Sequence, residues 1–273
     1  MRYLMRDGAP LTDSQWGQID AAVVQKAKET LVGRRFLTLV GPVGASTQNV
    51  HLDTLSDNHP AADFWGDNDE SQIRVKDRRF VNLAAIYSDF RMSWRDVENE
   101  RGAGVQAAID AAMAVARRED DVVFHGLKEM DIDGVFTAEG VNRLKIGDWN
   151  KGEAPLQDVV KAIEVLVGGG ASGQRALVVS SDLWGKLHRI QAGTGIMEVD
   201  RVRSLVNGGL FSSTRIGENK AVLLYTDPHN IDLVVGQDLT TAYLGNEQLD
   251  HIFRVFETVV PRVKRPRAIA VLE

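Results

Sequence analysis

The histidine and carboxylate side chains are the residues of this sequence that could bind a metal or transfer protons, and their spacing argues against both. No two of the six histidines stand four residues apart, the spacing that places two ligands on one helix face, and the HExxH motif is absent. The DIDG stretch at residues 131–134 lacks the remaining ligands of a calcium loop. Acidic runs such as residues 119–121 are typical of a solvated surface or of salt bridges between subunits. The sequence therefore predicts no catalytic residue and no metal site.

Motifs for nucleophilic catalysis and for phosphate binding are also missing. The GxSxG elbow of hydrolases is absent. Because the chain has no cysteine, it has no thiol nucleophile, disulfide or thiolate zinc site. The glycine run at residues 167–174 follows a predicted helix and precedes a predicted strand, which is the reverse of the order in a phosphate loop. We interpret it as a helix stop and a turn.

The composition is that of an ordinary globular protein, with 44% hydrophobic and 26% charged residues among 273. The net charge of −6 argues against general nucleic-acid binding. The basic run PRVKRPR at residues 261–267 could hold phosphates, but we interpret its cations as outward or interface residues between two strands. No apolar run of signal-peptide or membrane-spanning length follows Arg2 and Arg6, so we expect a cytoplasmic protein without a membrane partner.

The elements begin with a capped amphipathic helix. Thr12 and Gln15 have the spacing of a capping box, and Leu11 and Trp16 have that of a hydrophobic staple. Apolar residues then recur at spacings of three and four, and Gly33 is predicted to end the helix in a left-handed conformation. One stripe of this helix must therefore be buried against another part of the protein.

A long polar segment follows this helix and a short strand. Residues 47–80 are rich in turn-forming residues and contain an isolated aromatic pair, Phe64 and Trp65. A segment of this length without its own core is typical of a functional arm or of disorder. Because large aromatic side chains serve as anchors at interfaces, we interpret the segment as an extended hairpin that contacts a neighbouring subunit, with Phe64 and Trp65 as assembly residues.

Regular elements return after the arm. Residues 80–94 predict a strand pair or a bent strand, and residues 104–128 predict an alanine-rich helix roughly 35 Å long. From about residue 131 helices and strands alternate, which indicates an α/β subdomain. The strand-like C-terminal tail must rejoin the sheet begun near residue 80, so this subdomain is an insertion. With no chemistry in the sequence, the architecture favours binding and assembly over catalysis.

Six stretches of the sequence together carry a family resemblance: RDGAPLTDSQWGQID, LVGRRFLTLVGPVGA, FRMSWRDVENER, the ED and FHG of REDDVVFHG, VVGQDLTTAYLG and RVKRPRAIAVLE. In these stretches the chain resembles the encapsulin shell proteins, in particular the family 1, linocin M18-like encapsulins. These stretches occur in order along the whole chain. The resemblance implies an α+β fold of the HK97 phage-capsid type and self-assembly into an icosahedral compartment.

The resemblance implies three structural parts. Residues 1–46, 81–135 and 226–273 would form a peripheral domain with a cargo-facing N-terminal helix, residues 47–80 an extended loop (the E-loop), and residues 136–225 an axial domain. The shell would contain about 60 copies or more, with axial domains meeting at its five-fold axes. The residues of the five-fold pore loop would be Gln191, Ala192, Gly193, Thr194, Gly195 and Ile196. A flexible connection between two helices is the other interpretation of this loop.

The resemblance also implies a role for the capped N-terminal helix, which would help to form a groove for the C-terminal targeting peptide of a cargo enzyme. The residues implied to line it are Leu31, Arg34, Phe36, Val40, Asp238, Leu239 and Tyr243. An apolar groove would hold alternate side chains of the peptide, and Arg34 or Asp238 would fix its direction through charge-assisted bonds. The same residues could instead be ordinary core, with Arg34 as a cation at a helix end.

Two stretches, IGDWNKGEAP and LHRIQAGTGIMEVD, look more like shells that package ferritin-like iron-storage proteins than like those that carry a dye-decolourising peroxidase. Iron would then belong to the cargo, and the resemblance implies no cofactor in the shell itself. A prophage-derived major capsid protein is one alternative, against which the net charge argues. A bacteriocin or hydrolase-type activity is another, for which the sequence offers no catalytic group. A generic α+β ligand-binding protein would leave the arm unexplained.

Overall fold

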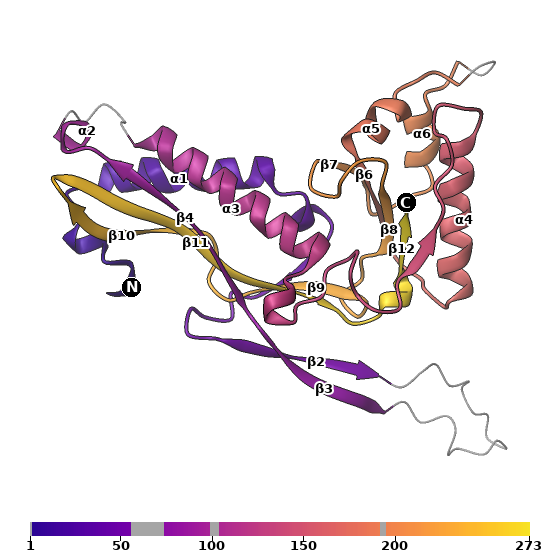
Figure 1. Cartoon of the computed structure of the whole chain (residues 1–273), viewed down its shortest axis with the longest axis horizontal. Coiled ribbons are helices and arrows are strands. Elements are labelled where there is room, and N and C mark those ends of the chain that lie inside the picture. Colours follow the sequence, from indigo (N-terminus) through magenta and orange to yellow (C-terminus); the bar gives the residue numbers. More distant parts are fainter. Residues whose placement is uncertain (1, 56–73, 99–103, 192–194) are drawn as a thin grey trace.

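A computed structural model of the chain describes residues 2–55, 74–98, 104–191 and 195–273 (Figure 1). This part of the chain contains two five-stranded sheets and a separate two-stranded arm. Phe64 and Trp65 lie outside the described residues, as do Ala192, Gly193 and Thr194 of the loop predicted to line a pore. The assignments made for these five residues therefore stay predictions.

The first sheet has the order β1–β9–β11–β10, and β4 also pairs with β11. Its strands are β1 (Thr38–Val40), β4 (Ala84–Met92), β9 (Ile231–Val235), β10 (Thr240–Glu247) and β11 (Asp250–Val263). The antiparallel register of β11 and β4 places Val259 opposite Ala84 and His251 opposite Met92. This pairing confirms for β11, the first part of the C-terminal tail, that it rejoins the sheet begun near residue 80.

Two helices, α1 (Asp13–Thr30) and α3 (Val105–His125), lie side by side over this sheet, and the short α2 (Trp94–Glu98) precedes α3 (Figure 1). The capping box of α1 is confirmed. Thr12 Oγ1 accepts the N–H of Gln15 at 3.3 Å, and Gln15 Oε1 accepts the N–H of Thr12 at 2.8 Å. The apolar stripe of α1 is buried, and Trp16 packs edge-on against Phe253 of β11.

The prediction that Gly33 ends α1 in a left-handed conformation is wrong. α1 ends at Thr30, and Gly33 begins the 3₁₀ helix η3 (Gly33–Arg35) without a positive φ. A Cβ at this position would lie 3.3 Å from Asp120 Oδ1 and 3.3 Å from Val123 Cγ1. The close approach of the backbone to α3 therefore favours glycine here, because a Cβ would press on these two side chains.

The second sheet has the order β5–β12–β8–β6–β7. Its strands are β5 (Asn142–Leu144), β6 (Arg175–Ser180), β7 (Leu210–Ser213), β8 (Ala221–Tyr225) and β12 (Ile269–Leu272). The helices around it are α4 (Ala154–Gly168), α5 (Ser181–Leu187) and α6 (Glu198–Arg203), at the opposite end of the molecule from α2 (Figure 1). The glycine run ends α4 and leads into β6, which confirms its interpretation as a helix stop and a turn.

The last strand of the chain corrects one predicted domain boundary. Residues 226–273 were all expected in the peripheral domain, but β12 pairs with β8 and β5 in the second sheet, with Ile269 opposite Leu224. The 3₁₀ helix η5 (Pro266–Ala268) carries the chain from β11 to this strand. Every residue of β12 is buried, so the strand is held by apolar neighbours on both faces. The chain end thereby ties the two sheets together.

The described part of the arm consists of β2 (Asn49–Leu55) and β3 (Val75–Asn82), an antiparallel pair that extends away from both sheets (Figure 1). Two arginines connect its base to the rest of the chain. Arg79 of β3 donates to Asp133 Oδ2 at 2.5 Å, and Arg262 of β11 donates to the backbone carbonyl of His51 at 2.9 Å. Contact of the arm with a neighbouring subunit stays a prediction.

Two cations of the basic run PRVKRPR differ from the expectation of outward or interface residues. Arg262 donates to both carboxylate oxygens of Asp232 at 2.8 and 2.7 Å, and Lys264 donates to Asp232 Oδ2 at 2.6 Å. Asp232 is buried. The two cations face Asp232 because a carboxylate that is buried without a cation would destabilise the fold.

Candidate functional site

A groove of about 450 Å³ lies between the N-terminal residues, α1 and the loop before β10. The residues that line it are Leu4, Arg6, Asp20, Val23, Val24, Gln237, Leu239 and Thr240. Four of these side chains are aliphatic, and the volume falls within the roughly 300–1,000 Å³ of typical ligand sites. The N-terminal residues that contribute to it form two short 3₁₀ helices, η1 (Arg2–Leu4) and η2 (Arg6–Gly8).

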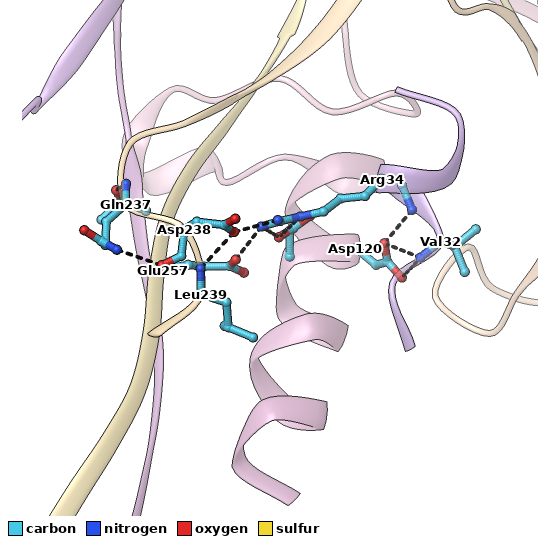
Figure 2. Close-up of polar contacts among 10 residues, drawn as sticks. Val32, Arg34, Asp120, Gln237, Asp238, Leu239 and Glu257 are labelled. Carbon is cyan, nitrogen blue, oxygen red and sulfur yellow. Dashed lines mark hydrogen bonds and ion pairs between the residues drawn. The ribbon is translucent and has the colours of Figure 1, made fainter. Parts of the chain in front are cut away.

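An ion cluster centred on Arg34 of η3 lies beside this groove (Figure 2). Arg34 Nε donates to Glu119 Oε1 at 2.8 Å, and Nη2 donates to Glu119 Oε2 at 2.7 Å and to Glu257 Oε2 at 2.6 Å. Nη1 donates to Asp238 Oδ1 at 2.7 Å. The side chains of Glu119 and Glu257 are 0% and 1% exposed, whereas that of Asp238 is 55% exposed. One guanidinium thus joins η3, α3, β11 and the groove loop.

The electrostatics of the cluster follow from burial around one cation. Burial would lower the pKa of Arg34, but the hydrogen bonds and charges of Glu119 and Glu257 raise that pKa above its ordinary value. Burial raises the pKa of Glu257 well above its ordinary value, and the negative charge of Glu119 adds to this effect. Arg34 is therefore needed to keep two carboxylates in the interior.

A second buried carboxylate contact fixes the backbone just before Arg34. Asp120 accepts the N–H groups of Val32 and Gly33 at 3.0 and 2.8 Å (Figure 2). Burial raises the pKa of Asp120 to about 7, although these two hydrogen bonds favour its charged form. The end of α1 is thus held against α3 by side-chain to backbone bonds.

The interpretation of residues 119–121 as a solvated or intersubunit acidic run is wrong, because Glu119 and Asp120 are buried and Asp121 pairs with Arg215 within the chain at 2.6 Å. A signal for Glu119 was present in the sequence. This residue continues the spacing of three and four from Ala116 to Val123 along the buried face of α3. Glu257 likewise occupies an inward position of the alternating pattern of β11.

The seven residues implied to contact a peptide do not all lie at the groove. Leu239 lines it, Asp238 adjoins it, and Leu31 packs with Ala27, Ala116 and Leu239 below it.

Val40 lies in β1 opposite Val234. Phe36 is in the core, with ring centroids 6.3 Å from Phe124 and 5.8 Å from Phe211. Tyr243 is buried, with its hydroxyl 3.0 Å from His251 Nδ1. Phe36 and Tyr243 therefore do not line this groove, and the bonds of Arg34 described above are all within the chain.

The sequence did not predict five of the residues that line the groove, namely Leu4, Arg6, Asp20, Gln237 and Thr240. The valines of α1 were only partly foreseen, because Val23 belongs to the predicted apolar stripe whereas Val24 is 41% exposed beside it. The available signal was an aliphatic residue directly beside the predicted stripe of this helix.

The described ends of the predicted pore loop lie close together between α5 and α6. The N–H of Gln191 donates to the carbonyl of Ile196 at 2.8 Å, and Ile190 forms an isolated bridge with Met197. Gly195 has a φ of +70° and Ile196 is 51% exposed. The two described ends of the loop therefore run antiparallel and close together.

Within the described residues, no cluster of three or more histidine, aspartate and glutamate side chains is arranged to hold a metal ion. None of the helices described is both long and apolar enough to span a membrane.

Comparisons with known proteins identify relatives over the whole chain. The family model described as encapsulating protein for peroxidase matches residues 1–260. The chain is 36% identical over 269 residues to a type 1 encapsulin shell protein of Myxococcus xanthus, covering 97% of this chain and 94% of the relative. It is 40% identical over 268 residues to a diheme-cytochrome–encapsulin shell fusion protein of Kuenenia stuttgartiensis, covering 96% and 74%. It is 28% identical over 204 residues to a ferritin-like–encapsulin shell fusion protein of Pyrococcus furiosus, covering 75% and 56%.

Solved structures share the fold. The virus-like particle from Pyrococcus furiosus superposes with a TM-score of 0.78 at 24% identity, covering 94% of this chain and 99% of that chain. The capsid of the Myoviridae phage XM1 superposes with a TM-score of 0.65 at 12% identity, covering 88% and 90%. The predicted α+β fold of the HK97 phage-capsid type is thus confirmed. Together with the family match along nearly the whole sequence, it establishes that this chain belongs to the family of encapsulin shell proteins.

Proposed function

We propose that this chain is the self-assembling subunit of an icosahedral shell that encloses a cargo enzyme. Its family membership and its capsid fold support this role. The shell would contain about 60 copies or more and would reside in the cytoplasm, without nucleic acid or membrane as partners. The subunit would act structurally, with no catalytic residue and no cofactor of its own.

The cargo that we propose is a ferritin-like iron-storage protein. The resemblance of two sequence stretches to shells with such cargo supports it, and so does the existence of a ferritin-like–encapsulin shell fusion protein in Pyrococcus furiosus. The fusion protein of Kuenenia stuttgartiensis carries a diheme cytochrome instead, so the class of cargo differs among relatives. Iron would be bound by the cargo rather than by the shell.

The observation that carries cargo binding is the groove between α1 and the loop before β10. Its aliphatic residues could hold alternate side chains of an extended C-terminal peptide. Asp238 adjoins the groove with its side chain 55% exposed, so its carboxylate could accept a hydrogen bond from the peptide backbone. Arg34 would act by holding Asp238 in place through the 2.7 Å bond between them, rather than by contacting the peptide itself.

The mass and shape of the purified protein test the assembly proposal. Light scattering with negative-stain microscopy should reveal hollow particles of about 1.8 MDa or more, 60 times the 30.1 kDa of one chain. Nucleic acid inside the particles would favour a prophage capsid protein instead. A monomer or a small ring at every salt concentration and pH would contradict the proposal.

A matched pair of valine variants tests the peptide proposal. Val24 lines the groove on α1 and is 41% exposed, and Val160 is 37% exposed on α4, far from the groove. A fluorescent reporter protein with a Leu/Gly/Ser-rich C-terminal tail should co-purify with wild-type and Val160→Asp shells but not with Val24→Asp shells. Equal loading of the two variants would contradict binding in this groove.

A further inference from the structure

Residues 2–8 contribute a distinct part of the groove. This N-terminal segment, residues 2–8, consists of η1 and η2 with Met5 between them in the left-handed region at a φ of 51°. It supplies Leu4 and Arg6 to the lining, and the hydroxyl of Tyr3 donates to Oε1 of the lining residue Gln237 at 2.5 Å. Three residues of the segment therefore lie at the groove or bond to a residue that lines it.

Arg6 joins this segment to both neighbouring elements of the groove. Its Nη1 and Nη2 donate to the two oxygens of Asp20 on α1 at 2.6 and 2.7 Å, and its Nε donates to the carbonyl of Thr241 on β10 at 2.9 Å. The guanidinium carbon lies 4.4 Å from the ring centroid of Trp16. This planar fork matches a carboxylate in two bonds, an arrangement that a lysine cannot reproduce.

We infer that the N-terminal segment forms one wall of the peptide groove and that Arg6 is the positioning residue that sets the groove's width. This inference rests on the proposed binding of a cargo peptide. Arg6 supplies three hydrogen bonds from this segment to α1 and β10, so without them the segment that carries Leu4, one apolar side of the groove, would be held less firmly.

The charges of the groove also define the peptide that it accepts. Arg6 and Asp20 are the charged residues of the lining, and they neutralise each other in a bidentate pair. Both oxygens of Asp20 and all three nitrogens of Arg6 have partners within the chain. The ligand at this point is therefore an extended peptide with uncharged, aliphatic side chains rather than an acidic or basic one.

The segment can be altered without disturbing the helix that follows. The first turn of α1 is capped by Thr12 and Gln15, which lie after the segment, so its terminal N–H groups keep their partners when Arg6 is changed. A variant without the bonds of Arg6 therefore tests the groove wall while α1 stays formed. A truncation through all of α1 would not make this distinction, because α1 also buries an apolar stripe.

The test measures the affinity of assembled shells for a fluorescent ten-residue peptide of leucine, glycine and serine, by anisotropy. Arg6→Ala should weaken binding by about tenfold or more, because the peptide would then have to order a loosened groove wall as it binds. Arg6→Lys, which keeps the charge but not the fork, should also weaken it. Arg35→Ala is the matched control, because Arg35 is an exposed arginine that donates to the carbonyl of Glu29 and does not line the groove. Replacing the leucines of the peptide by aspartate or lysine should abolish binding to wild-type shells.

The outcomes separate the two proposals. If the peptide does not bind wild-type shells, the proposed peptide groove is contradicted. If it binds wild-type, Arg6→Ala and Arg6→Lys shells equally, the groove stands and the role of Arg6 is overturned. Should Arg6→Ala fail to assemble, Asp20→Asn gives the same comparison, since it removes one charge of the pair and should weaken binding in shells of unchanged thermal stability.

Discussion

Arg34 and Glu257 are 223 residues apart in the sequence, yet Nη2 of the arginine donates to Oε2 of the glutamate at 2.6 Å. The same nitrogen donates to Glu119 at 2.7 Å, so one guanidinium serves two carboxylates that are almost completely buried. This geometry makes Arg34 a structural cation of the interior that also holds the exposed Asp238 at the groove.

Arg34→Ala should destabilise the subunit by about 3–5 kcal/mol, because it leaves Glu119 and Glu257 buried without their cation. Arg34→Lys should cost less, since one ammonium replaces some of these bonds. Thermal unfolding of both variants checks this prediction, with Arg35→Ala as the exposed control. An Arg34→Ala variant that keeps its thermal stability but loses cargo would instead place Arg34 in direct contact with the peptide.

Local patterns of the sequence were sufficient to predict the start of α1 and the presence of a strand in the C-terminal tail. The capping box of Thr12 and Gln15 depends on residues three positions apart, and the apolar alternation of β11 leaves one face for the sheet. The membership of β12 could not be predicted in this way. A strand that is buried on both faces carries no alternation, and nothing in its own sequence selects between two sheets.

The groove was harder to predict than the fold because it depends on long-range packing. Leu4, Val24 and Leu239 meet there from three distant segments, and no spacing along the chain relates them. The buried ion cluster was hard to predict for a different reason. Glu119 and Glu257 lie at inward positions of α3 and β11. A buried carboxylate can be predicted at such a position only when the cation that pairs with it can be identified. That cation, Arg34, comes from a third segment.

Asp120 should contribute a loss of stability as the pH rises from about 4 to about 7. Burial raises the pKa of Asp120 from 3.8 to about 7, so over this range the folded chain keeps a proton that the unfolded chain releases. The stabilising effect of this bound proton is complete below the pKa of Asp120 in the unfolded chain. The effect is lost as the pH rises through the pKa of Asp120 in the folded chain. The raised pKa of Glu257 has the same sign.

Asp120→Asn removes this titration while its amide oxygen can still accept the N–H of Gly33. The variant should therefore show a flatter dependence of the melting temperature on pH between pH 5 and pH 7.5, with a residual slope from Glu257. Asp148→Asn is the control, because Asp148 is exposed, its pKa is lowered by hydrogen bonds from Asn150, and it titrates below this range. Identical slopes in wild-type and Asp120→Asn protein would refute the assignment.

The base of the arm should control how uniformly the shell assembles. Arg79 of β3 bonds to Asp133, which lies after α3, so this pair is one of the two contacts, with that of Arg262 to His51, that fix the direction of the arm relative to the body of the subunit. Arg79→Ala should broaden the distribution of particle diameters in negative-stain images. It should change the stability of the subunit by only about 0–1 kcal/mol, because the pair is partly exposed.

The neighbouring Arg78 provides the matched control for this prediction. It pairs with Asp53 across β2 and β3 and thus lies within the arm rather than between the arm and the body. Arg78→Ala shells should keep a uniform diameter, and exchanging the charges in an Arg79→Asp, Asp133→Arg double variant should restore uniformity. Broad distributions for Arg78→Ala and Arg79→Ala alike would show that the direction of the arm is not what the Arg79 pair controls.

Phe64 and Trp65 are predicted from the sequence to be assembly residues, and they lie outside the described residues. Large aromatic side chains in a polar arm gain little unless another chain covers them, and such residues often supply a disproportionate share of interface energy. Replacing both by serine should therefore lower the guanidinium concentration at which particles dissociate, measured by light scattering, more than it lowers the unfolding midpoint of the subunit. Val167→Ser, at an exposed aliphatic residue of α4, should alter neither. If the doubly substituted shell dissociates at the wild-type concentration, the two aromatics do not hold the particle together, and the contacts of the arm must come from other residues such as the exposed Phe80 of β3.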